Sequence, residues 1–423
     1  MKNTARLALL WLAASAVVPA APQQVFRASV DLIPVDVQVL DADGRPIVGL
    51  QAKDFDVAID RKARRVVAVD FRHYNDLQPS TSLPPSSPRA RSDATPMGES
   101  QRIFVLAIDA HSLSDTESSG LVRALEGFVA QLSADDSVGF FTLPHGPSLR
   151  PTTNRAALRK VISSIVGGEG LRASPSNLSP VEVAEIVNSP SNPTGSSPTT
   201  PKSSPLPPNP DDMLRQLQVR ECGSLNDRAC TTNLTIEAET IQRQLEQEVS
   251  ESIGGIRALL AGLRDYQGPK TVVLASSGMP LSDRPGGWNS SGGEARNIGE
   301  DAARSRVSIY SLHIDRGLNR KFAPQVRDIR ITTSSSRDLE QRVLYDLAAS
   351  SGGALFSAAV DAGESALNRV LLETSSIYLL GVSPEKLDID GQTHALTVKL
   401  KPNIAGSITR HRKFVVLSAL PKV

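Results

Sequence analysis

Hydrophobic and polar residues alternate near the beginning of the chain with the period of two that is typical of β-strands. Apolar side chains occupy every second position of 35–39, and an Asp-Ala-Asp-Gly turn follows at 41–44. The segments 57–59 and 66–71 continue the apolar pattern. We therefore expect a small β-sandwich-like unit over residues 25–74.

The pattern changes to alternating strands and helices between residues 101 and 374. Strands are predicted at 103–108, 138–143, 271–275, 306–314 and 354–357, and helices at 114–132, 154–165, 241–263, 339–348 and 366–372. Alternation of this kind produces parallel sheets, so we expect an α/β fold with a doubly wound, mostly parallel sheet. The segment 375–423 again reads as strands, and the sequence leaves open whether it shares a domain with the N-terminal β unit.

Two segments rich in proline and serine interrupt these patterns. Residues 75–100 are predicted to be a linker, because this composition neither packs a core nor sustains a helix. Residues 174–210 are predicted to be an insertion outside the sheet, with one short helical turn at 181–187.

The N-terminus has the features of a secretory signal peptide. Lys2 and Arg6 precede an apolar stretch at 7–18, and small residues end at Ala20. The alternative is an uncleaved anchor, but roughly twelve apolar residues are fewer than the roughly twenty that span a bilayer. We expect cleavage of residues 1–20 and export to the periplasm or the outside. No later segment is apolar and long enough to be a transmembrane segment, so none is expected in the mature chain.

Composition narrows the classes of partner. Lys and Arg total 46 against 45 Asp and Glu, and aromatic residues make up 4%, which argues against nucleic acid. Cys222 and Cys230 are the only cysteines. In an exported protein they are expected to form a local disulfide, which we favour over metal binding because no histidine is nearby.

Several segments resemble the VWFA-related domain family that is common in Acidobacteria. They are 30–37, 44–55, the strand that ends in Asp109, 270–280, 350–353, 377–382, Asp390-Gly391 and the basic strand 410–413. The resemblance extends from about Val25 to the C-terminus and implies a von Willebrand A-like core. This family is defined by a domain with no reaction attached, so it implies fold more than function.

In the wider von Willebrand A fold, the resemblance implies a divalent cation at the carboxyl edge of the sheet. The cation is held by an Asp-x-Ser-x-Ser turn, a distant Thr and a further Asp. Here Asp109 is retained, but His111 and Leu113 take the two serine positions. Glu169 takes the threonine position and Ser277 that of the second aspartate, so the site is interpreted as degenerate.

Two interpretations of these residues remain. A rearranged Mg or Mn site could use the oxygens of Asp109, Ser112, Ser114, Glu169 and Ser277. The interpretation that we favour is that Asp109 and Ser114 only cap the following helix, because magnesium needs near-ideal oxygen geometry and position 113 is a leucine. No cofactor is therefore expected.

The sequence contains none of the common hydrolase, zinc-protease or nucleotide-binding fingerprints. We therefore predict a non-catalytic, exported protein-binding module or adaptor with an unidentified protein partner. One alternative is metal-dependent adhesion through the same loops. Another is a hydrolase in which Asp109 and His111 form a general-base pair. The basic segment 410–413 is predicted to be a solvated edge strand protected by charge.

Overall fold

The computed structural model describes residues 32–74, 102–167, 175–176, 178–187, 210–280, 291–315, 333–359, 362–401 and 407–416. All of them belong to one compact unit, Leu32–Val423. The predicted signal peptide and the predicted linker at 75–100 lie outside the described residues. Among the helices that are described, none combines the length and the apolar character needed to cross a membrane.

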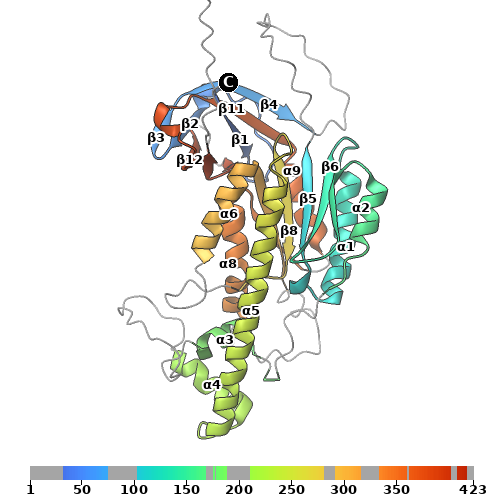
Figure 1. The fold of residues 1–423 in the computed structure, drawn as a ribbon, viewed down its shortest axis with the longest axis vertical. Helices are drawn as coiled ribbons and strands as arrows, with labels where there is room; N and C mark the ends of the chain where they lie inside the picture. The colour runs from blue at the N-terminus through green and yellow to red at the C-terminus, as the bar shows by residue number, and fades with distance from the viewer. Residues whose placement is uncertain are drawn as a thin grey trace, which may run out of the picture. The chain divides into compact units, whose positions relative to one another are not determined.

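A six-stranded sheet forms the centre of the described chain (Figure 1). Its strands are β5 (Ile103–Asp109), β6 (Ser137–Leu143), β7 (Ser148–Thr152), β8 (Lys270–Ser276), β9 (Val307–Ile314) and β10 (Leu355–Ala358). The order is β10-β9-β8-β5-β6-β7, and every pair is parallel except the edge pair β6 and β7. This order is that of a doubly wound sheet. The prediction of an α/β fold with a doubly wound, mostly parallel sheet is thereby confirmed.

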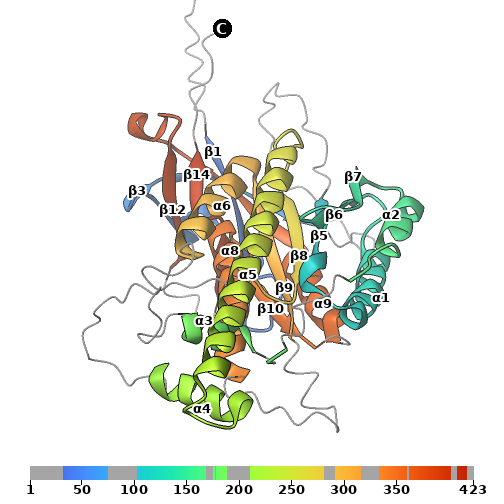
Figure 2. The same cartoon turned by 60° about the horizontal axis from the view of Figure 1, so that its bottom comes forward.

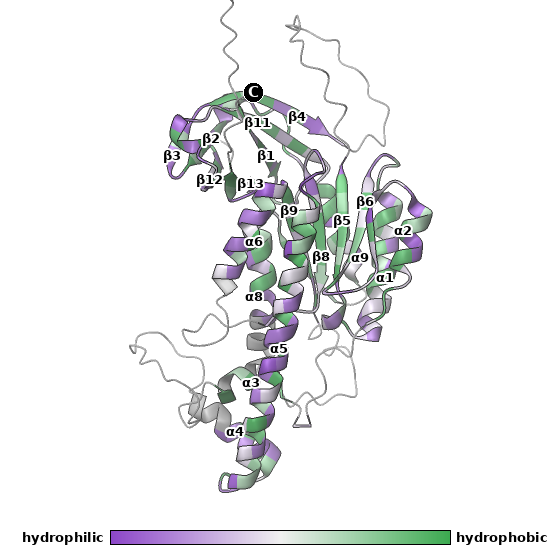
Figure 3. Ribbon diagram, in the orientation of Figure 1, coloured by the Kyte–Doolittle hydropathy of each residue, from purple (hydrophilic) through white to green (hydrophobic). Residues whose placement is uncertain are grey.

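Helices cover both faces of this sheet (Figure 2). One layer contains α1 (Asp115–Gln131), α2 (Arg155–Ile162) and α9 (Gly363–Glu373), and the other contains α5 (Arg228–Gly262), α6 (Ser291–Ser305) and α8 (Thr333–Ser351). Along β5, Phe104, Leu106 and Ile108 face the first layer. The intervening residues face the second layer, because successive side chains of a strand point to opposite faces. This double burial explains why the central strands are coloured as hydrophobic along their length in Figure 3.

The N- and C-terminal β segments together form a sandwich of two antiparallel sheets. Its strands are β1 (Ile33–Leu40), β2 (Phe55–Ile59), β3 (Lys62–Arg64), β4 (Val66–His73), β11 (Ser376–Val382), β12 (Thr393–Leu400), β13 (Ile408–His411) and β14 (Phe414–Val416). The sheet orders are β13-β1-β11-β4 and β14-β12-β2-β3, so each sheet contains strands from both ends of the chain. One hydrophobic core lies between the sheets. The question that the sequence left open is therefore answered by the strand pairing.

Polar residues on the outer face of β1 join the sandwich to the α/β core. Arg306, which precedes β9, donates to both carboxylate oxygens of Asp36 at 2.7 and 2.9 Å. The hydroxyl of Tyr310, buried in β9, donates to Gln38 at 2.7 Å. The inner face of β1 is apolar, so the alternation along this strand serves two different contacts.

Segment 410–413 begins in an edge strand, as expected, because β13 is the last strand of its sheet, but the expectation that this segment is solvated is wrong. Arg410 binds Glu373, whose side chain is fully buried, at 2.6 Å. His411 and Arg412 are only 5% and 7% exposed. Their burial follows from the pairing of β13 with β1 at the junction between the sandwich and the core. The charges of this segment are therefore used inside the fold.

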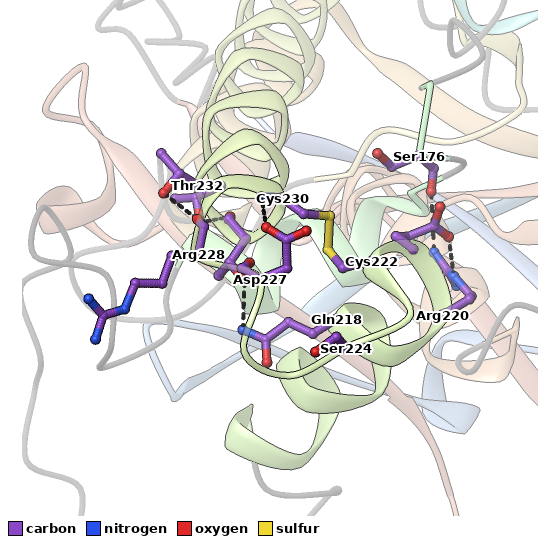
Figure 4. Close-up of a disulfide and its surroundings, with 12 residues drawn as sticks. Ser176, Gln218, Arg220, Cys222, Ser224, Asp227, Arg228, Cys230 and Thr232 are labelled. Carbon is purple, nitrogen blue, oxygen red and sulfur yellow. Dashed lines mark hydrogen bonds and ion pairs between the residues drawn. A yellow bond between two sulfur atoms is a disulfide. The ribbon is translucent and has the colours of Figure 1, made fainter.

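The insertion between β7 and β8 contains a small helical cluster of its own. α3 (Pro180–Val187) and α4 (Pro210–Cys222) pack against the first half of α5 through a separate apolar core that includes Val183, Leu217 and Leu234. Cys222 and Cys230 form a disulfide that joins the end of α4 to the start of α5 (Figure 4). The predicted short helix at 181–187 corresponds to α3.

Helix α5 is continuous through Gly254 and Gly255, where the sequence indicated a weak point. A Cβ on Gly255 would lie 2.6 Å from the Leu143 side chain at the end of β6. Glycine is used here because it lets the helix approach the sheet closely.

We predict that His394 makes the sandwich more stable below neutral pH. Its two ring nitrogens contact Asp60 and Asp390 at 2.8 and 2.9 Å, and these hydrogen bonds, chiefly that to Asp60, raise the pKa of His394. A raised folded pKa gives stabilisation that is full below the unfolded value of about 6.5 and is lost as the pH rises through the folded value. His394→Gln should therefore cost about 1 kcal/mol in urea unfolding at low pH, and much less at high pH.

Urea titrations of wild type and His394→Gln near pH 5.5 and pH 9 measure this difference. His73→Gln, at an exposed histidine of β4, is the matched control. An equal loss of stability at both pH values would show that the charge of His394 is not the cause.

Candidate functional site

The predicted site lies where β5 and β8 end side by side at the carboxyl edge of the central sheet. Asp109 is the last residue of β5, and Ser276 is the last residue of β8. The chain order of the strands reverses between these two strands, since β6 lies on one side of β5 and β8 on the other. Doubly wound sheets bind their ligands at such a switch point.

The Asp109 carboxylate is buried and bonded on both oxygens. The Ser252 hydroxyl of α5 donates to Oδ1 at 3.0 Å, and the Ser276 hydroxyl donates to Oδ2 at 2.8 Å. Asp109 is 3% exposed, and burial raises the pKa of its carboxyl group, although the serine hydrogen bonds oppose this. The three side chains connect two strands of the sheet to the helix that covers it.

Two further predicted residues, Ser112 and Ser277, lie beside Asp109. Ser112 follows β5 in the short 3-10 helix η2 (Ala110–Ser112), and its hydroxyl donates to the Asp109 carbonyl at 2.8 Å. The backbone N–H of Ser277 donates to the Ser112 hydroxyl at 3.0 Å. The Ser277 hydroxyl is buried and has no hydrogen-bond partner in the described part of the chain. A buried hydroxyl without a partner needs an explanation, such as a bound water or ligand.

The other two predicted residues do not join this group in the described chain. Ser114 is the N-cap of α1 and forms a capping box with Glu117, whose backbone N–H it accepts. Glu169 lies outside the described residues. Gly167, which begins the same loop, packs so closely on Ser114 that a Cβ would lie 2.5 Å from the Ser114 carbonyl carbon. The loop that leads to Glu169 therefore starts at the N-terminus of α1.

The helix-capping interpretation is correct for Ser114 and wrong for Asp109. Asp109 makes no side-chain cap, because its carboxylate points to Ser252 and Ser276 instead of the following backbone. Leu113 is fully buried in the core, so it cannot be replaced by a polar ligand residue without loss of packing. At position 113 the turn therefore contributes a hydrophobic contact.

A cavity opens beside these serines at the carboxyl edge. Its lining includes Asp109, His111, Ser277, Glu248 from α5 and Glu340 from α8. His111 is exposed and makes no hydrogen bond to the Asp109 carboxylate in the described structure. The residues that a general-base pair would require are near each other but are not connected.

Sequence reasoning missed Ser252 and Ser276. Ser252 carried a signal, because it is a polar residue on the otherwise apolar face of α5, between Val249 and Ile256. Such a residue is expected to have a buried partner. Ser276 carried none beyond its place next to Ser277.

The described residues offer few ligands for a divalent cation. They contain no group of three or more histidine, cysteine, aspartate or glutamate side chains arranged to hold a metal ion. A cation bound to Asp109 would have to replace the hydrogen bonds from Ser252 and Ser276. Magnesium in particular requires near-ideal octahedral oxygen geometry, which one serine-bonded carboxylate does not supply.

Comparisons with known proteins give little further information. No protein-family model matches the chain, and no curated protein matches it significantly. Among solved structures, the chain is similar to proximal thread matrix protein 1 of the mussel byssus, described with a zinc-occupied MIDAS motif. The identity is 10%, the TM-score is 0.19, and the match covers 67% of this chain and 98% of that chain. The fold assignment rests on the strand order and not on this likeness.

We predict that Ser252→Ala lowers the free energy of unfolding by about 1.5–3 kcal/mol, because it removes a hydrogen bond to a buried carboxylate. Urea unfolding at neutral pH measures the loss. Ser250→Ala, at an exposed position of the same helix, should change stability by less than about 0.5 kcal/mol. Equal effects of the two changes would contradict the hydrogen bond as a stabilising contact.

Proposed function

We propose that this chain is an exported, non-catalytic, von Willebrand A-like module that binds another protein at the carboxyl edge of its central sheet without a divalent cation. The observation that carries this proposal is the internal bonding of Asp109 to Ser252 and Ser276. In a metal-dependent site, this aspartate would have to face the ion. Here its two oxygens are already satisfied by serine hydroxyls of the same chain.

The chemistry of the cavity supports a different kind of ligand from that of a metal site. A bound cation with an open coordination position takes an acidic group from its partner. Glu248 and Glu340 line this cavity, so without a cation it favours a basic or neutral polar group. The buried, unpartnered Ser277 hydroxyl could bond to such a group. The proposed partner surface is therefore one that inserts a basic or amide side chain.

Catalysis is less well supported. A hydrolase would need a nucleophile hydrogen-bonded to a base. The Ser112 hydroxyl donates to the Asp109 carbonyl oxygen. His111 is exposed and is not the acceptor of this hydrogen bond. We therefore propose that Ser112 and His111 take part in binding and not in catalysis.

Export is proposed from the signal-peptide features of residues 1–20 and from the Cys222–Cys230 disulfide. A disulfide is stable in the periplasm or outside the cell, where thiols are not kept reduced. Both features indicate a partner in an oxidising compartment.

The second candidate function is metal-dependent adhesion at the same edge. The observation in its favour is the assembly of Asp109, Ser112 and Ser277 around one cavity, with the Ser277 hydroxyl unpartnered. Mg or Mn would recruit an acidic group instead of a basic one.

Thermal unfolding with and without cations separates the two functions. We expect the melting temperature measured in EDTA to equal that measured with millimolar Mg2+, Mn2+ or Ca2+, because the described residues contain no preformed group of metal-binding side chains. A ligand at a hundredfold its dissociation constant would add about 2.7 kcal/mol, which is easily detected. A saturable rise that disappears in Asp109→Ala and persists in Asp43→Ala, at an exposed aspartate, would establish the adhesion function instead.

Site-specific cross-linking tests the binding surface itself. A photoreactive residue at His111 should give a defined adduct with a host protein in the presence of EDTA. The same residue at Lys62, exposed on β3, is the control. Identical adduct patterns at the two positions, or adducts that need Mg2+, would contradict metal-independent binding at this edge.

A further inference from the structure

A second cavity lies at the opposite, amino-terminal edge of the central sheet, where the sandwich meets the core. The charged residues that line it are Asp36, Arg102, Lys270, Arg306 and Arg412. These residues come from β1, from the beginnings of β5, β8 and β9, and from the connection between β13 and β14. The lining is therefore assembled from both parts of the fold, and four of its five charges are positive.

Two of the four cations form an ion pair with a carboxylate of the described residues. Arg306 binds Asp36 through two short hydrogen bonds from Nη2. Arg102 binds Asp136, which is outside the cavity, at 2.9 and 2.6 Å. These two ion pairs neutralise the charges of Arg306 and Arg102. The positive charges of Lys270 and Arg412 are not neutralised by either pair.

Lys270 is buried, and among the described residues its ammonium hydrogen-bonds to neutral groups alone. It is 3% exposed, and its ammonium donates to the carbonyls of Tyr266 and Gly268 at 2.7 and 3.0 Å. Burial, with the nearby charges of Arg306 and Arg412, lowers the pKa of Lys270 to about 8. Carbonyl oxygens satisfy its hydrogen bonds but leave a full positive charge inside the protein.

Arg412 is also a buried cation whose hydrogen bonds go to backbone carbonyls. It is 7% exposed, and its two terminal nitrogens donate to the carbonyls of Ala303 and Pro34 at 3.3 and 2.6 Å. Its Nε is buried and has no hydrogen-bond partner in the described chain. Burial also lowers the pKa of this guanidinium. The Asp36 carboxylate is the nearby negative charge for both cations, but neither of them hydrogen-bonds to it, and it is already paired with Arg306. Two buried cations that share one carboxylate with a third are costly, and the unused Nε–H of Arg412 is a donor available to an anion.

We propose that this cavity, which we name the junction cavity, binds a small oxyanion of the phosphate or sulfate type between Lys270 and Arg412. The size of the ligand follows from the cavity volume of about 40 Å³. This space holds a few water molecules or one small ion, and it excludes a nucleotide or a peptide. The charge of the ligand follows from Lys270 and Arg412, which form no ion pair with a carboxylate in the part of the chain that the structure describes.

The position of the ion also predicts its effect on the fold. Arg412 belongs to the sandwich and Lys270 to the α/β core. An oxyanion between them would replace a repulsion across this junction with two charge-assisted contacts. Binding should therefore stabilise the full chain against unfolding.

Calorimetric titration of the full chain with inorganic phosphate, at pH 7 and constant ionic strength, tests the proposal. We expect one saturable site in wild type. Lys270→Met should weaken binding at least tenfold, because it removes one of the two unneutralised charges while keeping the apolar stem. Lys53→Met, at an exposed lysine, should bind as wild type does.

A second variant, which should tighten phosphate binding instead of weakening it, keeps the proposal testable if Lys270→Met does not fold. Asp36→Asn removes the single carboxylate in the lining, so it should tighten phosphate binding several-fold even though it breaks the ion pair to Arg306. A purely structural role of these charges predicts no such gain.

Sulfate should compete with phosphate, and chloride at the same ionic strength should not. Sulfate and phosphate also stabilise proteins without binding, by exclusion from the surface, and that effect grows without saturation. No saturable heat up to roughly 50 mM phosphate, or equal stabilisation of wild type, Lys270→Met and Asp36→Asn, would overturn the proposal. Lys270 and Arg412 would then serve only as caps of backbone carbonyls.

Discussion

The burial of the central sheet on both faces is the constraint on which the other features depend. Phe104 and Leu106 face one helical layer, while Val105 and Ala107 face the other, so no polar side chain can be placed on the middle of β5 without cost. On β5 and β8, the charged side chains therefore lie at the ends of the strands. Asp109 lies at the carboxyl edge, and Lys270 lies at the amino edge. The candidate site and the junction cavity both lie at strand ends because the middle of these strands is covered by apolar side chains on both faces.

The sequence predicted best those elements whose signal is local. The buried strands β5, β6 and β8 were expected because short runs of apolar residues mark strands covered on both faces. Helix α6 was not expected, since it buries small residues such as Ala295 and Ala302 and begins with Ser-Gly-Gly. Strand β7 was also missed, because it contains Pro151, which an edge strand tolerates and a central strand does not.

The functional residues also divide into those that the sequence indicated and those whose contacts are distant in sequence. Asp109, Ser112 and Ser277 were found because a resemblance placed them at the ends of strands. Ser252 was not found, because its importance comes from a contact 143 residues away in sequence. Arg412 was assigned to a solvated strand for the same reason. Its neighbours, Pro34 and Ala303, come from distant segments, and no periodicity in the 410–413 segment indicates them.

Helix α5 connects the carboxyl-edge site to the insertion. Ser252, which bonds Asp109, and Cys230, which holds the end of α4, lie on this one helix, roughly 33 Å apart at ~1.5 Å per residue. Gly255 allows the helix to pack closely on Leu143, so its position over the sheet is narrowly defined. The geometry of the Ser252–Asp109 hydrogen bond therefore depends on the packing of α5, the helix that also carries the disulfide-linked cluster. A shift of α5 over the sheet would therefore affect both the Ser252–Asp109 hydrogen bond and the close contact at Gly255, because the same helix carries both.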